Sequence, residues 1–339
     1  MSGWQALPRA DPLPWLLADE DPAIRHLALR QLLDRPADDR EVAAARAAAM
    51  ATGPSARILA AQHPEGYWVK PGAGYGPKYM GTVWQVIFLD QRGADGDDPR
   101  VRQACEYVLA HCATSAGGLG MSASEADKPP SPAAVIHCLN GNMLRALLGF
   151  GWLEDERVQK ALDWQARATT GEGFDRYYAS GTSGPGFACA ANEKQPCAWG
   201  AVKAVLALAR VPEEKRTTQM QRALAQGAEF LRSRDPAVAD YPWPSYAKKP
   251  NESWFKLQFP LGYVTDVLQN LEALCDAGYA RDPRLGNAVQ WLLGKQDAQG
   301  RFPNQYAYTG KTWVDVDVQG RPSKWVTLRA CRVLKAVYG

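Results

Sequence analysis

Apolar residues recur along most of this chain at spacings of three and four, the period of a helix with one buried face. Two kinds of helix alternate. One kind opens with an acidic residue, then Pro or Glu and Arg, and keeps a charged side, which is typical of an outer helix. Helices of this kind are predicted over residues 97–111, 154–167, 214–233 and 281–296.

The other kind has little charge, as in the run VKAVLALA at 202–209, and is predicted to be buried on most sides. Its members are predicted over residues 79–91, 133–150, 196–210, 260–277 and 323–338. Aromatic anchors in the charged helices recur about every 60 residues, at Tyr107, Trp164, Phe230 and Trp291. The chain is therefore predicted to be all-α and built from repeated pairs of a charged and an apolar helix.

The connections between these helices are unequal. An apolar helix reaches the next charged helix through a short turn, whereas the reverse connection is long. The long segments are 62–79, 112–132, 167–196, 233–259 and 296–323, and they hold more than half of all Phe, Trp and Tyr residues. Loops longer than about 12–15 residues are usually functional or disordered. In an antiparallel array these loops share one end, here named the long-loop face, and we expect a pocket there; the other end is the short-turn face.

The first 60 residues follow a different pattern. DPAIRHLALRQLL and DREVAAARAAAM read as two short amphipathic helices, joined around Pro36. They resemble a HEAT-like pair that closes one edge of the array. We therefore expect an N-terminal helical extension over residues 1–60 and the main domain over residues 61–339.

Composition narrows the class of protein. A net charge of +3 without a basic run gives no support for a nucleic-acid partner. No apolar run approaches the roughly 18 residues of a membrane span, and the start lacks a signal-peptide pattern. Seven cysteines in 339 residues indicate a reducing compartment, so we expect a cytoplasmic protein. No pattern predicts an oligomeric state.

A second motif overlaps the repeat. It reads Gln62-x3-Gly66-x-Trp68 near the start, and near the end Gln296-x3-Gly300-x-Phe302. These stretches resemble the Gln-to-Trp repeats of the terpenoid cyclase and protein prenyltransferase α/α toroid superfamily. The chain also resembles uncharacterised bacterial prenyltransferase/squalene-oxidase-repeat proteins at 63–68, 138–158 and 320–335. The resemblance implies a single α/α toroid, with alternating inner and outer helices around a cavity and a site at the N-terminal ends of the inner helices.

Acidic residues supply the first candidates for chemistry. Squalene-type cyclases use an Asp-x-Asp-Asp motif, and the literal match at 95–98 lies in a short turn, where we interpret it as a helix cap. Asp266 is expected one to two turns inside an apolar inner helix, where burial raises the pKa of a carboxyl and suits a general acid. A hydrogen-bonded structural acid is the alternative. Lys78, Tyr79 and Tyr263 are candidates for orienting a hydroxyl or carbonyl, or are ordinary rim residues.

Cysteines supply the second set of candidates. Cys197 opens an inner helix, Cys189 lies in the longest loop, and His137 and Cys138 begin another inner helix. A helix N-terminus stabilises a thiolate, so Cys197, Cys189 and His137 are candidate catalytic groups. Cys138, Cys189 and Cys197 are also candidate zinc ligands, although the spacing typical of zinc sites is missing. In residue types the set resembles the metal-free toroidal linalool dehydratase-isomerase, and buried structural cysteines are the remaining alternative.

Aromatic residues of the long loops are candidates for substrate binding, because ring faces suit apolar or cationic species. They are Trp68, Tyr75, Tyr177, Tyr178, Trp243, Trp254 and Trp313. The leading hypothesis is an enzyme that acts on a small hydrophobic, for example isoprenoid-like, substrate by acid/base chemistry of the lyase, isomerase or cyclase type. The alternatives are a zinc-dependent transferase or hydrolase, and a non-catalytic binding or scaffold protein.

Overall fold

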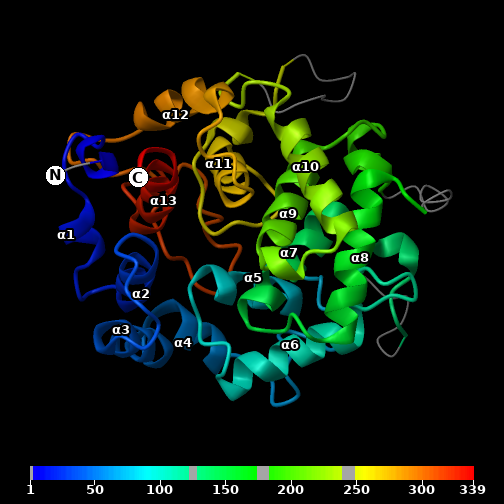
Figure 1. The fold of residues 1–339 in the computed structure, drawn as a ribbon. Coiled ribbons are helices and arrows are strands. Elements are labelled where there is room, and N and C mark those ends of the chain that lie inside the picture. The colour runs from blue at the N-terminus through cyan, green and yellow to red at the C-terminus, as the bar shows by residue number, and fades with distance from the viewer. Residues whose placement is uncertain (1–2, 122–127, 174–182, 239–248) are drawn as a thin grey trace.

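Six inner helices surround the axis of the molecule in the computed structural model, which describes residues 3–121, 128–173, 183–238 and 249–339 (Figure 1). They are α2 (Pro22–Gln31), α5 (Thr82–Gln91), α7 (His137–Gly149), α9 (Ala198–Ala209), α11 (Val267–Asp276) and α13 (Lys324–Tyr338). Consecutive members from α5 to α13 pack against each other, and α13 packs against α2. The chain therefore winds once around the axis.

An outer layer of helices surrounds this ring (Figure 1). It consists of α3 (Arg40–Ala51), α4 (Gly53–Ala60), α6 (Pro99–Cys112), α8 (Glu156–Thr170), α10 (Thr218–Arg232) and α12 (Gly286–Leu293), with the short α1 (Leu13–Leu16) before α2. The described residues form isolated β-bridges but no extended strand. The predicted all-α toroid of alternating inner and outer helices is confirmed.

The N-terminal helices complete the ring. Near the start of α2, Glu20 pairs with Lys324 at 3.3 Å, and at its end the carbonyl of Gln31 accepts from Lys335 at 3.1 Å. Helices α2 and α13 are therefore parallel neighbours. This is the edge at which the sequence predicts an N-terminal helix pair, and the structure adds α4, which the prediction lacked. A domain boundary at residue 60 stays a prediction.

The repeated acidic residues before the outer helices are N-caps. The carboxylates of Asp98, Asp155 and Asp282 each accept from the backbone N–H two residues ahead, at 2.9, 2.8 and 2.9 Å. Such caps stabilise a helix by about 1 kcal/mol. The match to the cyclase motif at 95–98 thus lies on the short-turn face as a cap, where Asp95 also pairs with Arg46 at 2.7 Å.

Two inner helices begin markedly later than predicted. Helix α11 starts at Val267 instead of residue 260, because Asp266 has an extended backbone and caps the helix by accepting from the N–H of Gln269. Helix α7 starts at His137 instead of residue 133, because Ser131 caps a separate 3₁₀ turn at Pro132–Ala134. Both differences lie at the N-terminal ends of inner helices, and therefore on the long-loop face.

The inner helices are buried on nearly all sides. In α5 every residue from Thr82 to Leu89 is buried, and in α9 the buried run extends from Gly200 to Leu208. Burying one large aliphatic or aromatic side chain contributes about 1.5–3 kcal/mol, so the inner helices contribute strongly to the apolar stabilisation of the fold. Among the described residues, no helix has the length and apolar character needed to cross a membrane.

Candidate active site at the long-loop face

Lys78 lies at the centre of an aromatic cluster on the long-loop face. Its ammonium nitrogen is 4.6 Å from the ring centre of Tyr263 and 5.1 Å from that of Tyr79. The Tyr75 ring lies 6.1 Å from Tyr263, and Tyr308 packs edge-on to Tyr79 at 4.6 Å. These rings come from the segments that precede α5, α11 and α13, and their faces stabilise a positive charge. The structure thus brings the predicted residues Tyr75, Lys78, Tyr79 and Tyr263 together.

Cys138 lies close to this cluster, at the second residue of α7. Burial raises the pKa of its thiol to about 12, and the charge of nearby Cys189 acts in the same direction. A Cys138 thiolate would raise the pKa of both Lys78 and Tyr263. Burial itself lowers the pKa of Lys78 and raises that of Tyr263, so the lysine is a stronger acid than usual and the phenol keeps its proton.

Cys189 and Cys197 form a pair of interacting thiols. Cys197 is the N-cap of α9 and Cys189 precedes the 3₁₀ turn Ala190–Asn192. The Cys197 thiol donates to the Cys189 sulfur, which lowers the pKa of Cys189, and the backbone N–H groups of that turn add to the effect. The same hydrogen bond and burial raise the pKa of Cys197. Cys189 is therefore the thiol that ionises first. The prediction of an activated Cys197 at the N-terminus of α9 gains no support, because its pKa is raised.

His137 has a structural role instead of the predicted catalytic one. Its Nδ1 accepts from the side-chain amide of Gln165 at 3.0 Å, and its Nε2 donates to the carbonyl of Gly184 at 2.8 Å. This pattern is that of the neutral ring, in agreement with burial lowering its pKa to about 4. Both ring nitrogens are occupied, so His137 positions the loop before α9.

The zinc hypothesis gains no support from the geometry. Within the described part of the chain, no group of three or more His, Cys, Asp and Glu side chains is placed to hold a metal ion. All seven cysteines are free, and Cys138, Cys189 and Cys197 are each only partly exposed. The three predicted ligands therefore share a region of the fold without forming a cage.

Asp266 also lies deeper than its predicted role requires. It is fully buried, and its carboxylate accepts from the N–H groups of Gln269 at 2.6 Å and Gln258 at 2.9 Å, with Arg329 at 3.7 Å. Burial raises its pKa, as the sequence predicts. A fully buried carboxylate held in this way caps α11, so the geometry favours the alternative of a hydrogen-bonded structural acid.

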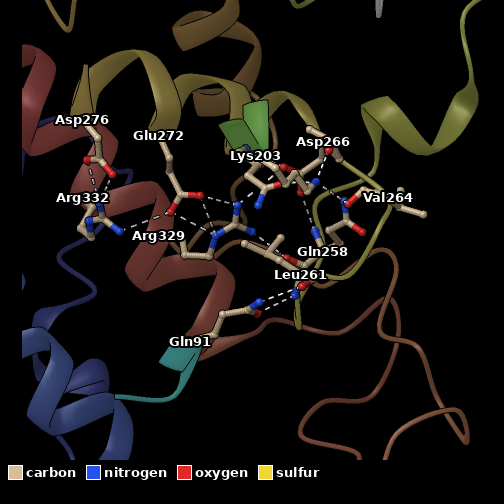
Figure 2. A network of polar contacts seen from close by, with 12 residues as sticks. Gln91, Lys203, Gln258, Leu261, Val264, Asp266, Glu272, Asp276, Arg329 and Arg332 are labelled. Atoms are coloured by element: carbon tan, nitrogen blue, oxygen red, sulfur yellow. Dashed lines mark hydrogen bonds and ion pairs between the residues drawn. The ribbon is translucent and has the colours of Figure 1, made fainter. Parts of the chain in front are cut away.

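Lys203 on α9 is the residue that the sequence-based prediction missed. It is buried, and its ammonium donates to the carbonyls of Tyr263 and Val264 at 3.3 Å each, to Gln269 Oε1 at 2.6 Å and to the Thr265 hydroxyl (Figure 2). Burial lowers its pKa to about 7. It fixes the segment that carries Tyr263. The sequence contains a signal for this role, because a single lysine in an otherwise apolar helix is costly unless it is hydrogen-bonded.

The predicted aromatic residues divide into two groups. Trp68 and Trp254 are fully buried, and their indole N–H groups donate to the carbonyls of Ile58 at 2.8 Å and Pro236 at 2.7 Å, so both pack the core and present no surface to a substrate. Tyr75 and Trp313 are partly exposed, and Trp313 donates to the carbonyl of Met80, beside Tyr79. Tyr177, Tyr178 and Trp243 lie outside the described residues.

A cavity of about 390 Å³ opens on the short-turn face, the opposite end from the one where the sequence predicts a pocket. We name it the axial cavity, because all six inner helices contribute to its wall. Their contributions include Gln31, Asp90, Arg145, Arg210, Asp276 and Arg332, most of them from the last turns of these helices. The thiols are not part of its wall.

Comparison with known proteins supports the fold. No family model and no curated protein matches the sequence. An unsaturated glucuronyl hydrolase specific for heparin matches the structure with a TM-score of 0.51 at 11% identity, over 97% of this chain and 86% of that one. The type II terpene cyclase MstE from Scytonema matches at 0.48 and 14%, over 94% and 87%. A protein from Actinoplanes matches at 0.44 and 17%, over 93% and 90%. At these identities the similarity concerns the toroid fold alone.

Proposed function

We propose that the protein is an enzyme that acts on a small hydrophobic, isoprenoid-like substrate by acid/base chemistry at the long-loop face. The observation that carries the proposal is the Cys189–Cys197 thiol pair. Cys189 acts electrostatically on Cys138, and Cys138 in turn acts on Lys78 of the tyrosine cluster. A thiolate and an acidic ammonium in one site can remove one proton and deliver another. The rings of Tyr75, Tyr79 and Tyr263 would hold an apolar chain and stabilise positive charge that develops on it.

An allylic alcohol is the substrate type that uses all of these groups. The Cys189 thiolate takes a proton from carbon, the C–H electron pair forms a new C=C bond, and the C–O bond breaks. Lys78 protonates the departing oxygen, so the products are a diene and one water molecule. Proton return from the thiol to the lysine through solvent resets the site. Addition of water at the other allylic carbon gives the isomeric alcohol by the reverse steps.

Geraniol is a suitable first probe, with products identified by gas chromatography and mass spectrometry. We expect the wild-type protein to form a diene or an isomeric alcohol, and Cys189→Ser to lower turnover by about 100-fold or more. Cys275→Ser is the matched control, because this thiol is also partly exposed but lies at the end of α11, on the short-turn face. The proposal fails if Cys189→Ser is as active as the wild type, or if no allylic alcohol of about 5 to 15 carbons is converted.

A zinc-dependent activity and a non-catalytic binding role stay as alternatives, and no contact among the described residues favours either. Metal analysis of untagged protein separates the first of them from the present proposal.

A further inference from the structure

The axial cavity holds a second group of charged residues, away from the thiols. Its wall carries four arginines and three carboxylates, namely Arg145, Arg210, Arg329, Arg332, Asp90, Glu272 and Asp276. The activity proposed above uses none of them. Whether the cavity has charge left for a ligand depends on how these groups pair with each other.

Each of the three carboxylates is engaged by an arginine from another inner helix. Arg210 on α9 lies 3.0 Å from Asp90 on α5. Arg329 and Arg332 on α13 lie 2.6 Å from Glu272 and 3.0 Å from Asp276 on α11, and Figure 2 shows these pairs side by side. Burial alone would raise the pKa of Glu272, but the two arginines more than offset it, so this carboxyl is ionised. No free acid is left on the wall.

Arg145 on α7 is the remaining charge. Its guanidinium has no hydrogen bond and no ion pair with any residue that the structure describes, and its side chain is only partly exposed. Asp90 and Glu272 are near enough to affect its pKa, but both are bound to other arginines. A guanidinium that is partly removed from water gains most from a charged acceptor, and its planar fork fits carboxylate or phosphate oxygens.

Apart from Gln31 and Gln91, the rest of the cavity wall is apolar. The Phe259 and Trp325 rings stack at 4.5 Å between centres, and Leu261 and Leu328 line the same space. The volume of about 390 Å³ lies within the range of roughly 300–1,000 Å³ found for small-molecule sites. The space therefore suits a ligand with an apolar body as well as an anionic group.

We propose that the axial cavity binds a small organic anion, in which one carboxylate or phosphate group pairs with Arg145 and an apolar body packs on Phe259 and Trp325. This site does not depend on the thiol chemistry proposed for the long-loop face. Arg145 lies toward the C-terminal end of α7, whereas Cys138 and Cys197 lie at the N-terminal ends of α7 and α9, so Arg145 and the thiols can be altered separately.

Isothermal titration calorimetry with octanoate, inorganic phosphate and 1-octanol tests the proposal. We expect octanoate to bind more tightly than phosphate, which lacks the body, and more tightly than 1-octanol, which lacks the charge. Arg145→Gln should weaken octanoate binding by about tenfold or more, the loss typical of one charged hydrogen-bonded contact. Ala209→Phe, which fills the cavity without changing its charge, should weaken it as well. Arg222→Gln, an exposed arginine on outer helix α10, is the matched control and should bind octanoate as the wild type does.

Four results would overturn the proposal. The first is the absence of octanoate binding to the wild type at millimolar concentration. The second is equal affinity in Arg145→Gln. The third is phosphate binding as tight as octanoate binding, which would show that the apolar body does not contribute to binding. The fourth is an affinity that is lost in Lys78→Gln but kept in Arg145→Gln, which would place the ligand at the long-loop face.

Discussion

The same helices build the two faces of this toroid, but one face carries thiols and tyrosines and the other carries arginine–carboxylate ion pairs. On the long-loop face the inner helices begin, and Cys138 and Cys197 lie in or next to their first turns. On the short-turn face they end, and Arg210 and Lys335 lie in or next to their last turns. A helix N-terminus favours negative charge and a C-terminus favours positive charge. Burial outweighs this effect at Cys138, and burial together with the Cys189 hydrogen bond does so at Cys197, while Asp90 and Asp276 lie at the C-terminal ends of α5 and α11 and are held there by arginines.

A buried polar network connects the two faces. It passes from Lys203 through Gln269 and Asp266 to Arg329, and from there to Glu272 (Figure 2). Such a network is costly when one member is lost, because its partners stay buried without a countercharge. Two substitutions within it test how much the network contributes to stability.

Removing Arg329 should have the largest effect on stability. Arg329→Met leaves the carboxylates of Glu272 and Asp266 buried without their main countercharge, so we expect the free energy of unfolding to fall by about 3–5 kcal/mol. Urea denaturation measures this change. The control is Arg222→Met, which breaks an exposed pair with Glu172 and should change stability by less than about 0.5 kcal/mol. Equal effects of the two substitutions would contradict the account of the network.

Lys203 should make stability depend on pH. Burial lowers its pKa from 10.5 to about 7 in the folded protein, so between these values the unfolded chain binds more protons. Stability therefore rises with pH in this window. Relative to Lys203→Met, the wild type should gain about 2 kcal/mol in unfolding free energy between pH 7 and pH 9. A difference between the two proteins that stays constant over this range would show that Lys203 keeps an ordinary pKa.

Much of the fold follows from the sequence, because it depends on local patterns. The alternation of charged and apolar helices, the Asp98, Asp155 and Asp282 caps and the unequal connections all involve residues close together in the chain. Hydrophobic spacing predicts the start of α11 too early, because Asp266 fits a helical position although it is the N-cap. That distinction depends on a backbone conformation that hydrophobic spacing does not reveal.

The candidate site was predicted only in part. The cluster of Lys78, Tyr75, Tyr79 and Tyr263 follows from placing the long loops on one face. The roles of Lys203 and Arg145 do not follow from the sequence. The partners of Lys203 lie far away in the chain, and the acids near Arg145 are bound by arginines from other helices. The axial cavity was missed for the same reason: its wall is assembled from the ends of six helices.

The central claim is that Cys189, activated by Cys197, makes the long-loop face the reactive one. It is tested most directly by the pH dependence of iodoacetamide alkylation, followed for each cysteine by mass spectrometry, with buried Cys105 as the slow internal reference. We predict that Cys189 reacts with a midpoint below the ordinary thiol pKa of about 8.5, and that Cys197→Ala moves this midpoint upward by about one pH unit or more. A midpoint at or above 8.5 in the wild type, or no shift in Cys197→Ala, would contradict the account.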